Sequence, residues 1–375
     1  MATTGFAQLR EFLASDPDNL ALLADAAEAA FAEEDLAAAE ALVARAEALA
    51  PLSPPLQHLS GLIAMRQERW STAAERYAAL LSRGNDAPPI RFNLAWSRAM
   101  DKQFEAARDV LTDATAEALP QAAQLQIGLL HQLGDIDLAL TRAHILLALF
   151  PEHRGLNAAV STLAIDGDDM ALARDTATRA GDHPDALVTL GTLALGDDAV
   201  DAAEDLFAAA LAGNADSPRA WVGQGLAKLA RNEPHAATKS LDRGAQLFGD
   251  HLGSWLAAGW AHVIAGDIAL GRSRFETALA LDDRFGEAQG SLAVIDLMEG
   301  RVDEARRRTE IALRLDRQSF AGALAAMMLR AGEGDEAAAR RIFERALTVS
   351  IDPQGRTLGE ALVRLGGLGG KGQSS

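Results

Sequence analysis

Small side chains recur along the chain at an interval of about 34 residues. Seven of the nine intervals are 34 residues, the other two are 32 and 30, and the members of the series are Ala39, Ala73, Ala107, Ala139, Ala173, Ala203, Ala237, Gly271, Ala305 and Ala339. Large apolar residues often follow four positions later, which places both on one face of a helix: Val43, Tyr77, Leu111, Phe207, Leu241, Phe275 and Phe343. This period predicts a stack of helical hairpins, because a lone enzyme domain has no reason to keep such a repeat.

The same numbering shows a second series of small residues. We number each unit 1–34 from residues 20, 54, 88, 120, 154, 184, 218, 252, 286 and 320. Position 8 is small in eight units and large at Ile127 and Met327; its small members are Ala27, Gly61, Ala95, Ser161, Gly191, Gly225, Gly259 and Ala293. Small residues at positions 8 and 20 would let the two helices of a hairpin approach closely, and the larger residues at position 24 would fill the space between hairpins.

The expected turns between the two helices contain glycine followed by aspartate. They are Gly134-Asp135, Gly266-Asp267 and Gly334-Asp335. Glycine can end the first helix in a left-handed conformation, and aspartate can cap the second.

This pattern resembles the tetratricopeptide repeat family, whose unit is a pair of antiparallel helices. The resemblance covers residues 20–353 and extends to Trp221 and Trp255 at the family's position 4. It implies an all-α fold, namely a right-handed superhelical α-solenoid of ten antiparallel helix pairs. We expect residues 1–19 to supply an N-terminal capping helix (Phe6 to Leu13), residues 354–366 a C-terminal capping helix and residues 367–375 a flexible tail. The intervals of 32 and 30 residues predict shortened turns near 114–122 and 180–186, with a kink at the second.

The resemblance also implies which residues bind a partner. In this family the first helix of each unit lines a concave wall, mainly through positions 2, 5, 9, 12 and 13. The predicted groove residues are therefore His58, Leu62, Met65, Phe92, Trp96, Met100, Val222, Leu226, Leu256, Trp260, Val263, Ile264, Val294, Leu297 and Met298. A wall so rich in apolar groups suits an amphipathic helix or apolar segment, with Trp96 and Trp260 as hot spots. Alternatively, these side chains pack against adjacent first helices, or the chain's own terminal helix fills the groove.

The inner positions argue against one known binding mode of the family. A clamp for a C-terminal carboxylate needs lysine at position 5 and asparagine at position 9, and neither residue occurs there. Asn93 at position 6 stands alone, so an asparagine ladder is not expected either.

Composition and charge narrow the function further. Cysteine is absent, which excludes disulfides, thiolate catalysis and zinc–thiolate sites. The net charge is −18, and it arises from residues 1–50 (−8) and 164–216 (−10). Nucleic-acid binding is therefore disfavoured; an acidic solubilising face and a site for basic partners both remain open. We see no signal peptide, and the longest uncharged stretch, residues 48–65, contains three prolines and should not insert into a membrane. We therefore expect a soluble, cytoplasmic protein.

No pattern of reactive residues indicates catalysis or a cofactor. The eight histidines form no HExxH pair, and the string beginning at Asp166 lacks the later glutamate of a calcium loop. The tail sequence GGKGQS lacks the Ser/Thr of a phosphate loop. We predict no enzyme activity, no metal and no cofactor. A basic stripe is either an ion-paired solvated face or a docking patch for an acidic partner; it consists of Arg306, Arg307, Arg308, Arg340, Arg341 and Arg345.

The sequence thus predicts a non-catalytic scaffold or adaptor that binds a partner polypeptide in an apolar concave groove. Two alternatives remain. One is a chaperone-like holder of secretion or envelope substrates, which also needs an apolar wall. The other is a regulatory subunit of a separately encoded enzyme, since bacterial arrays of this type are often fused to enzyme domains.

Overall fold

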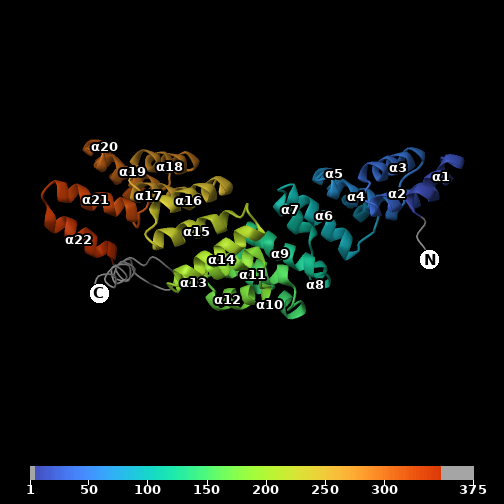
Figure 1. Ribbon diagram of the computed structural model, residues 1–375, viewed down its shortest axis with the longest axis horizontal. Helices are drawn as coiled ribbons and strands as arrows, with labels where there is room; N and C mark the ends of the chain where they lie inside the picture. Colours follow the sequence, from blue (N-terminus) through green and yellow to red (C-terminus); the bar gives the residue numbers. More distant parts are fainter. Residues whose placement is uncertain (1–4, 348–375) are drawn as a thin grey trace. The chain divides into compact units, whose positions relative to one another are not determined.

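The computed structural model describes residues 5–347, and within them it contains 22 helices and no strand (Figure 1). The predicted C-terminal capping helix (354–366) and tail (367–375) lie outside the described residues, as do the side chains from Phe343 onward. Consecutive helices joined by short turns pack against each other as hairpins. The prediction of an all-α solenoid of antiparallel helix pairs is confirmed.

Each of the ten repeats opens with a first helix of 13 residues that starts at position 1. These are α2 (Leu20–Ala32), α4 (Pro54–Arg66), α6 (Pro88–Met100), α9 (Pro120–Gln132), α11 (Arg154–Asp166), α13 (Pro184–Gly196), α15 (Pro218–Ala230), α17 (Leu252–Ile264), α19 (Gly286–Met298) and α21 (Phe320–Gly332). Proline or a side-chain cap at most of these starts fixes where the first helix begins.

The second helices are more variable in length. They are α3 (Leu36–Leu49), α5 (Trp70–Ser82), α7 (Phe104–Val110) with α8 (Asp113–Ala118), α10 (Ile136–Leu149), α12 (Met170–Ala180), α14 (Val200–Gly213), α16 (Pro234–Phe248), α18 (Ile268–Leu281), α20 (Val302–Leu315) and α22 (Glu336–Leu347). Ahead of the first repeat, α1 (Phe6–Ser15) buries Phe6, Leu9 and Leu13 against α2 and its neighbours.

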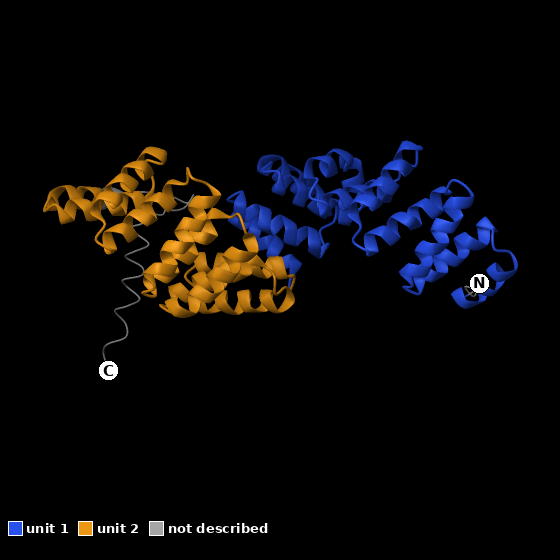
Figure 2. Ribbon diagram, turned by 90° about the horizontal axis from the view of Figure 1, so that it is seen from above, with its two compact units in different colours: residues 1–181 blue, residues 182–375 orange. Residues whose placement is uncertain are grey.

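The chain forms two compact units, residues 1–181 and 182–375 (Figure 2). The first holds α1 to α12 and the second α13 to α22. The boundary falls in the segment 180–186, where the sequence predicts a kink.

Every repeat turns from its first to its second helix through one residue at position 15 with a positive φ angle. Gly134, Gly266 and Gly334 have φ values of 79°, 88° and 82°, as predicted. In six of the ten repeats, position 15 holds a residue other than glycine, with a φ angle between 56° and 63°. These residues are Glu34, Glu68, Lys102, Asp168, Asp198 and Asn232. A left-handed conformation is unfavourable for residues with a side chain, so the repeat geometry imposes these turns.

The predicted aspartate caps are present in two of three turns. The Asp267 carboxylate accepts a hydrogen bond from Leu270 N–H at 3.0 Å, and Asp335 accepts one from Ala338 N–H at 2.9 Å. The expectation for Asp135 is wrong, because its side chain makes no capping hydrogen bond and instead lies 3.8 Å from Arg108.

Close contact between positions 8 and 24 holds each hairpin together. Tyr77 and Phe275 are fully buried, and a Cβ atom added to Gly61 or Gly259 would lie 2.7 Å or 2.3 Å from their respective rings. In repeat 4 the sizes are exchanged: position 8 is the large Ile127 and position 24 is the small Ala143, and both are fully buried in one cluster. The total volume at this contact is therefore kept while its two halves exchange size.

The third repeat departs from the others. Its second helix is broken at Leu111–Thr112 into α7 and α8, so most of the segment 114–122, where we expect a shortened turn, is helical. The Thr112 hydroxyl caps α8. Arg142 of α10, whose side chain is 9% exposed, binds Glu117 at 2.9 Å and Asp113 at 3.3 Å. The buried guanidinium fixes α8 in place, which explains how this repeat absorbs a loss of two residues.

Candidate functional site

Three large apolar side chains in the second unit are exposed on adjacent first helices. Leu226 on α15, Ile264 on α17 and Met298 on α19 are 41%, 59% and 50% exposed (helices in Figure 1). Ile264 and Met298 occupy the equivalent position 13 of their repeats. The three helices are the first helices of successive repeats and share core clusters. Val222 of α15 packs on a cluster of residues from α16 and α17, and Trp260 of α17 packs on a cluster that contains Ala293 and Val294 of α19.

Half-buried apolar groups lie beside Ile264 and Met298 on α17 and α19. Leu256, Trp260 and Val263 pack against Phe275 and its cluster, and Leu297 packs against Val294. The indole of Trp260 meets the ring of Phe275 edge-on at 5.4 Å between centroids. We call the set Leu226, Leu256, Trp260, Val263, Ile264, Leu297 and Met298 the C-terminal apolar face. Its members belong partly to the core and partly to the surface.

The structure corrects one of the predicted groove residues. Val294 is only 4% exposed and is a core residue. The cause is the close approach of α19 and α21, whose backbones meet at two glycines: a Cβ atom on Gly290 would lie 2.3 Å from the backbone nitrogen of Gly322. With the helices so near each other, Val294 is covered by Ala325 and Leu324.

The predicted groove residues of the first unit are mostly covered. Only Met100 is exposed, at 41%. The rings of Phe92 and Trp96 on α6 have their centroids 6.0 Å apart, and both side chains pack on the cluster that contains Ala107 and Leu125. The remaining residues, His58, Leu62 and Met65 on α4, are half-buried. The predicted groove residues of α4 and α6 therefore belong to a different unit from those of α15, α17 and α19.

The side chain of His58 packs in an apolar environment. Its ring meets Tyr77 edge-on at 5.6 Å, and its Nδ1 is buried without a hydrogen-bond partner. Burial lowers the pKa of His58 below its ordinary value. With its Nδ1 buried and unbonded, His58 behaves as a packing group on this helix.

Several other histidines have structural roles. The Nδ1 atoms of His153, His183 and His251 accept hydrogen bonds from backbone N–H groups at the starts of α11, α13 and α17. His131 and His262 are hydrogen-bonded to Asp166 at 2.7 Å and Asp242 at 3.0 Å. Among residues 5–347 no group of three or more His, Asp or Glu side chains is arranged to hold a metal ion.

The two position-4 tryptophans also have structural roles. The indole N–H of Trp221 donates to the Ala215 carbonyl at 2.8 Å, and that of Trp255 donates to the Gly249 carbonyl at 2.7 Å. Each tryptophan thereby ties a first helix to the loop that precedes it.

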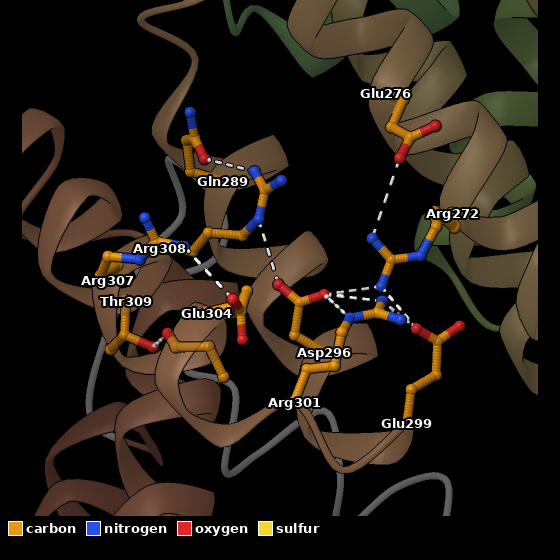
Figure 3. Close-up of polar contacts among 11 residues, drawn as sticks. Arg272, Glu276, Gln289, Asp296, Glu299, Arg301, Glu304, Arg307, Arg308 and Thr309 are labelled. Atoms are coloured by element: carbon orange, nitrogen blue, oxygen red, sulfur yellow. Dashed lines mark hydrogen bonds and ion pairs between the residues drawn. The ribbon is translucent and has the colours of Figure 1, made fainter.

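A buried carboxylate joins repeats 8 and 9 and was not predicted from the sequence. Asp296 on α19 is 2% exposed and contacts Arg272 at 2.7 Å, Arg301 at 2.9 Å and Arg308 at 3.1 Å (Figure 3). Glu299 accepts a second contact from Arg272 at 2.8 Å and one from Arg301. The three arginines compensate the buried charge of Asp296 inside the protein, so this network is a structural joint between repeats.

The same joint recurs between other repeats. Position 21 of one repeat contacts position 14 of the next in four pairs: Glu40–Gln67, Glu204–Arg231, Arg272–Glu299 and Arg306–Glu333, at 3.0, 3.0, 2.8 and 2.7 Å. In the three pairs other than Glu40–Gln67, opposite charges 27 residues apart in successive units were the available sequence signal. Within the predicted basic stripe, Arg306, Arg307 and Arg308 each bind an acidic residue. For these three the ion-paired alternative holds.

Comparison with known proteins identifies the repeat. Residues 58–123 and 256–320 match a family model described as tetratricopeptide repeat. The chain is a tetratricopeptide-repeat protein. Repeat proteins of this family are generally non-catalytic scaffolds for protein interaction. No match was found among curated proteins.

Solved tetratricopeptide-repeat structures share the fold. A human IFIT1 dimer with m7Gppp-AAAA is 13% identical over 89% of this chain and 91% of that chain, with a TM-score of 0.53. The Cut9–Hcn1 hetero-tetramer of the APC/C is 14% identical over 96% of this chain and 86% of that chain, with a TM-score of 0.52. At such low identity the likeness shows the fold alone. Within residues 5–347, no helix is both long and apolar enough to cross a membrane.

Proposed function

We propose that this tetratricopeptide-repeat protein is a cytoplasmic, non-catalytic scaffold whose second unit binds an amphipathic helix or apolar segment of a partner protein. The proposal rests on one observation. Leu226, Ile264 and Met298 are between 41% and 59% exposed on three neighbouring first helices. Exposed apolar groups gathered on adjacent elements are typical of interaction sites.

The chemistry of the C-terminal apolar face favours an apolar segment as the partner. Helix α17 carries no Asp, Glu, Lys or Arg, and its one histidine, His262, is buried and hydrogen-bonded to Asp242. Leucine or similar residues spaced i, i+3, i+4 and i+7 on a partner helix would match successive exposed groups on this face. Full burial of one large aliphatic side chain contributes about 1.5–3 kcal/mol, so three half-exposed anchors support micromolar rather than nanomolar binding.

The first test substitutes exposed members of the face and spares the core. In the variant Ile264→Asp/Met298→Asp we expect binding to weaken at least tenfold with no change in helical circular dichroism. The matched control, Leu281→Asp/Leu315→Asp, alters residues on second helices that are 46% and 40% exposed. Trp260 is unsuitable here because it packs on Phe275.

The readout is isothermal titration with an amphipathic helical peptide of Leu, Ala, Gln and Lys, alongside a scrambled peptide of the same composition. A scaffold binds the helix with a micromolar dissociation constant and the scrambled chain at least tenfold more weakly. Equal affinity for both peptides would instead indicate a promiscuous holder. No binding below about 1 mM, or equal loss in the control variant, would reject the C-terminal apolar face as the site.

A pull-down from native cells identifies the partner. It uses the wild type, the Ile264→Asp/Met298→Asp variant and the Leu281→Asp/Leu315→Asp control as baits. We expect at least one protein to be retained by the wild type and the control and lost with Ile264→Asp/Met298→Asp. If that protein is an enzyme whose activity changes on release, the chain acts as a regulatory subunit through this face.

A further inference from the structure

A solvent-open cavity lies in the second unit at the joint between repeats 7 and 8. Its volume is about 630 Å³, within the ~300–1,000 Å³ range of ligand pockets. It lies between the first turns of α16 and the turn that joins α17 to α18. The polar side chains that line it are those of His235, Thr238, His262 and Asp267. None of them belongs to the C-terminal apolar face.

The cavity occurs where a joint lacks its ion pair. At the other joints of the second unit, position 21 of one repeat binds position 14 of the next, in the pairs Glu204–Arg231, Arg272–Glu299 and Arg306–Glu333. Between repeats 7 and 8 the two positions hold Thr238 and Ala265, and both residues line the cavity. These short side chains cannot form an ion pair, so the space that two long charged side chains occupy elsewhere stays open.

The preceding joint shows which group fits such a space. Arg231, at position 14 of repeat 7, contacts three carboxylates at 2.8, 3.0 and 3.2 Å, those of Asp201, Glu204 and Glu233. They stand at positions 18 and 21 of repeat 6 and position 16 of repeat 7. One repeat later the same three positions hold polar residues that line the cavity, namely His235, Thr238 and Asp267. A guanidinium from outside the chain would therefore take the place that corresponds to that of Arg231.

His262 contributes a hydrogen-bond acceptor to the cavity. It is 6% exposed, and its Nε2–H donates to the Asp242 carboxylate at 3.0 Å. Because a carboxylate only accepts, Nε2 carries the proton, and Nδ1 of the neutral ring is an acceptor. Within the described part of the chain, Nδ1 has no hydrogen-bond partner. An unpaired acceptor on a buried residue that lines the cavity favours a ligand with N–H donors.

We propose that this cavity binds a guanidinium group, carried by an arginine side chain of a partner polypeptide. Asp267 supplies the negative charge, since its carboxylate has lone pairs beyond the one that caps Leu270 N–H at 3.0 Å. The planar guanidinium has five N–H donors, enough to reach acceptors on separate elements, whereas an ammonium has three on one atom. The side chain of Leu270, 40% exposed, lies beside Asp267 on the cavity wall for the methylene stem.

A polypeptide is the expected source of the guanidinium. Ile264 of the C-terminal apolar face is 59% exposed and directly precedes Ala265, so a segment bound to that face passes close to the cavity. This choice of source rests on the proposed function, whereas the guanidinium site itself does not. Because the cavity offers one carboxylate where Arg231 has three, we expect a single arginine to bind with a dissociation constant on the order of 1–10 mM.

NMR titration of the full chain with N-acetyl-arginine-amide tests the site. At about pH 8, above the ordinary histidine pKa of about 6.5, the ring signals of His235 and His262 should shift and saturate by about 50 mM, several times this dissociation constant. N-acetyl-citrulline-amide has the same shape without the charge and should bind at least tenfold more weakly. N-acetyl-lysine-amide should bind at least threefold more weakly. No saturable shift, or an equal affinity for citrulline, would overturn the proposal.

Two variants test the lining residues. Ala265→Arg places a guanidinium at the position that corresponds to Arg231, so it should abolish binding and raise the urea midpoint of unfolding. Asp267→Asn keeps the cap of α18, because asparagine caps as well as aspartate, and should weaken binding at least fivefold. The control is Asp335→Asn, at the same position of repeat 10, where the carboxylate caps Ala338 N–H at 2.9 Å. Undiminished binding by Ala265→Arg, or an equal loss in Asp335→Asn, would reject the site.

The amphipathic peptide of the previous section tests the source. Replacement of its terminal lysine by arginine should tighten binding to the wild type at least threefold and leave binding to Ala265→Arg unchanged. If N-acetyl-arginine-amide binds and neither peptide does, the site stands and the proposed function fails. If the peptides bind and N-acetyl-arginine-amide does not, the proposed function stands and the guanidinium site fails. Binding of both without a gain from arginine would overturn the assignment to a segment on this face.

Discussion

Phe207 occupies space that two glycines leave free. A Cβ atom on Gly191 or Gly223 would lie 2.8 Å or 2.3 Å from its ring, and Phe207 itself is fully buried. The first glycine belongs to the same hairpin and the second to the next one. A single ring thus fills both the space within a hairpin and the space between two hairpins, which is why position 24 is large where position 8 is glycine.

Gly259→Ala tests this contact. The added methyl group would lie 2.3 Å from Phe275, and the ring can move only by disturbing its cluster. We expect a loss of about 1–3 kcal/mol in the free energy of unfolding, measured by urea denaturation.

Gly128→Ala is the matched control, because no heavy atom lies within 4 Å of its added methyl group in α9. There we expect a gain of about 0.5–1 kcal/mol from helix propensity alone. Equal effects of the two substitutions would show that position 8 does not limit packing.

Much of the residue-level packing was predictable from the sequence. The exceptions have a common physical cause, because both depend on contacts between different repeats. Spacing alone identified the small and large positions, because each repeat places them at the same points of the helix. Spacing did not predict that Val294 is buried, since its burial depends on how closely α19 and α21 approach. Nor did it predict Asp296, whose partners come from two different repeats.

At the scale of elements, the turn inside each repeat is more uniform than its sequence. The three glycine turns were predicted, whereas the six left-handed turns formed by residues with side chains were not. Nothing in the residue type of Glu34 or Lys102 signals a positive φ; only the shared register of position 15 does.

Lys102→Gly should relieve this unfavourable conformation, since Lys102 has a φ of 60°. We expect a gain of about 0.5–1 kcal/mol in the free energy of unfolding, measured by urea denaturation. Lys102→Ala keeps a Cβ atom and should give no gain. A gain of the same size in the alanine variant would point to the loss of the lysine charge instead.

At the scale of the whole molecule, ion pairs between repeats make stability depend on pH. Asp242 of α16 binds Arg274 at 2.7 Å and His262 at 3.0 Å, both in the following repeat. Burial by itself would raise the pKa of Asp242, but the hydrogen bonds from Arg274 and His262 outweigh it and hold the pKa below its ordinary value of 3.8. The stability from this contact is therefore present above pH 3.8 and is lost as the pH falls through the lower, folded-state pKa.

Asp242→Asn should lower the free energy of unfolding at pH 7 by about 1.5–3 kcal/mol, the usual contribution of a hydrogen bond to a charged group. Urea denaturation between about pH 7 and pH 2.5, a range that crosses the usual carboxylate pKa, should show the wild type and the variant converging at the acid end. Asp205→Asn, at an exposed carboxylate on α14, should change little at either pH. A difference between wild type and Asp242→Asn that stays constant down to the lowest pH would exclude this linkage.

The hydrophobic core is divided along the chain into small clusters, each shared by adjacent repeats. A pulling force applied at the two ends of either unit would therefore load one cluster at a time. The hairpins would then unfold one after another and not in a single cooperative step. Each unit would stretch like a spring and re-form its lost hairpins when the tension is released.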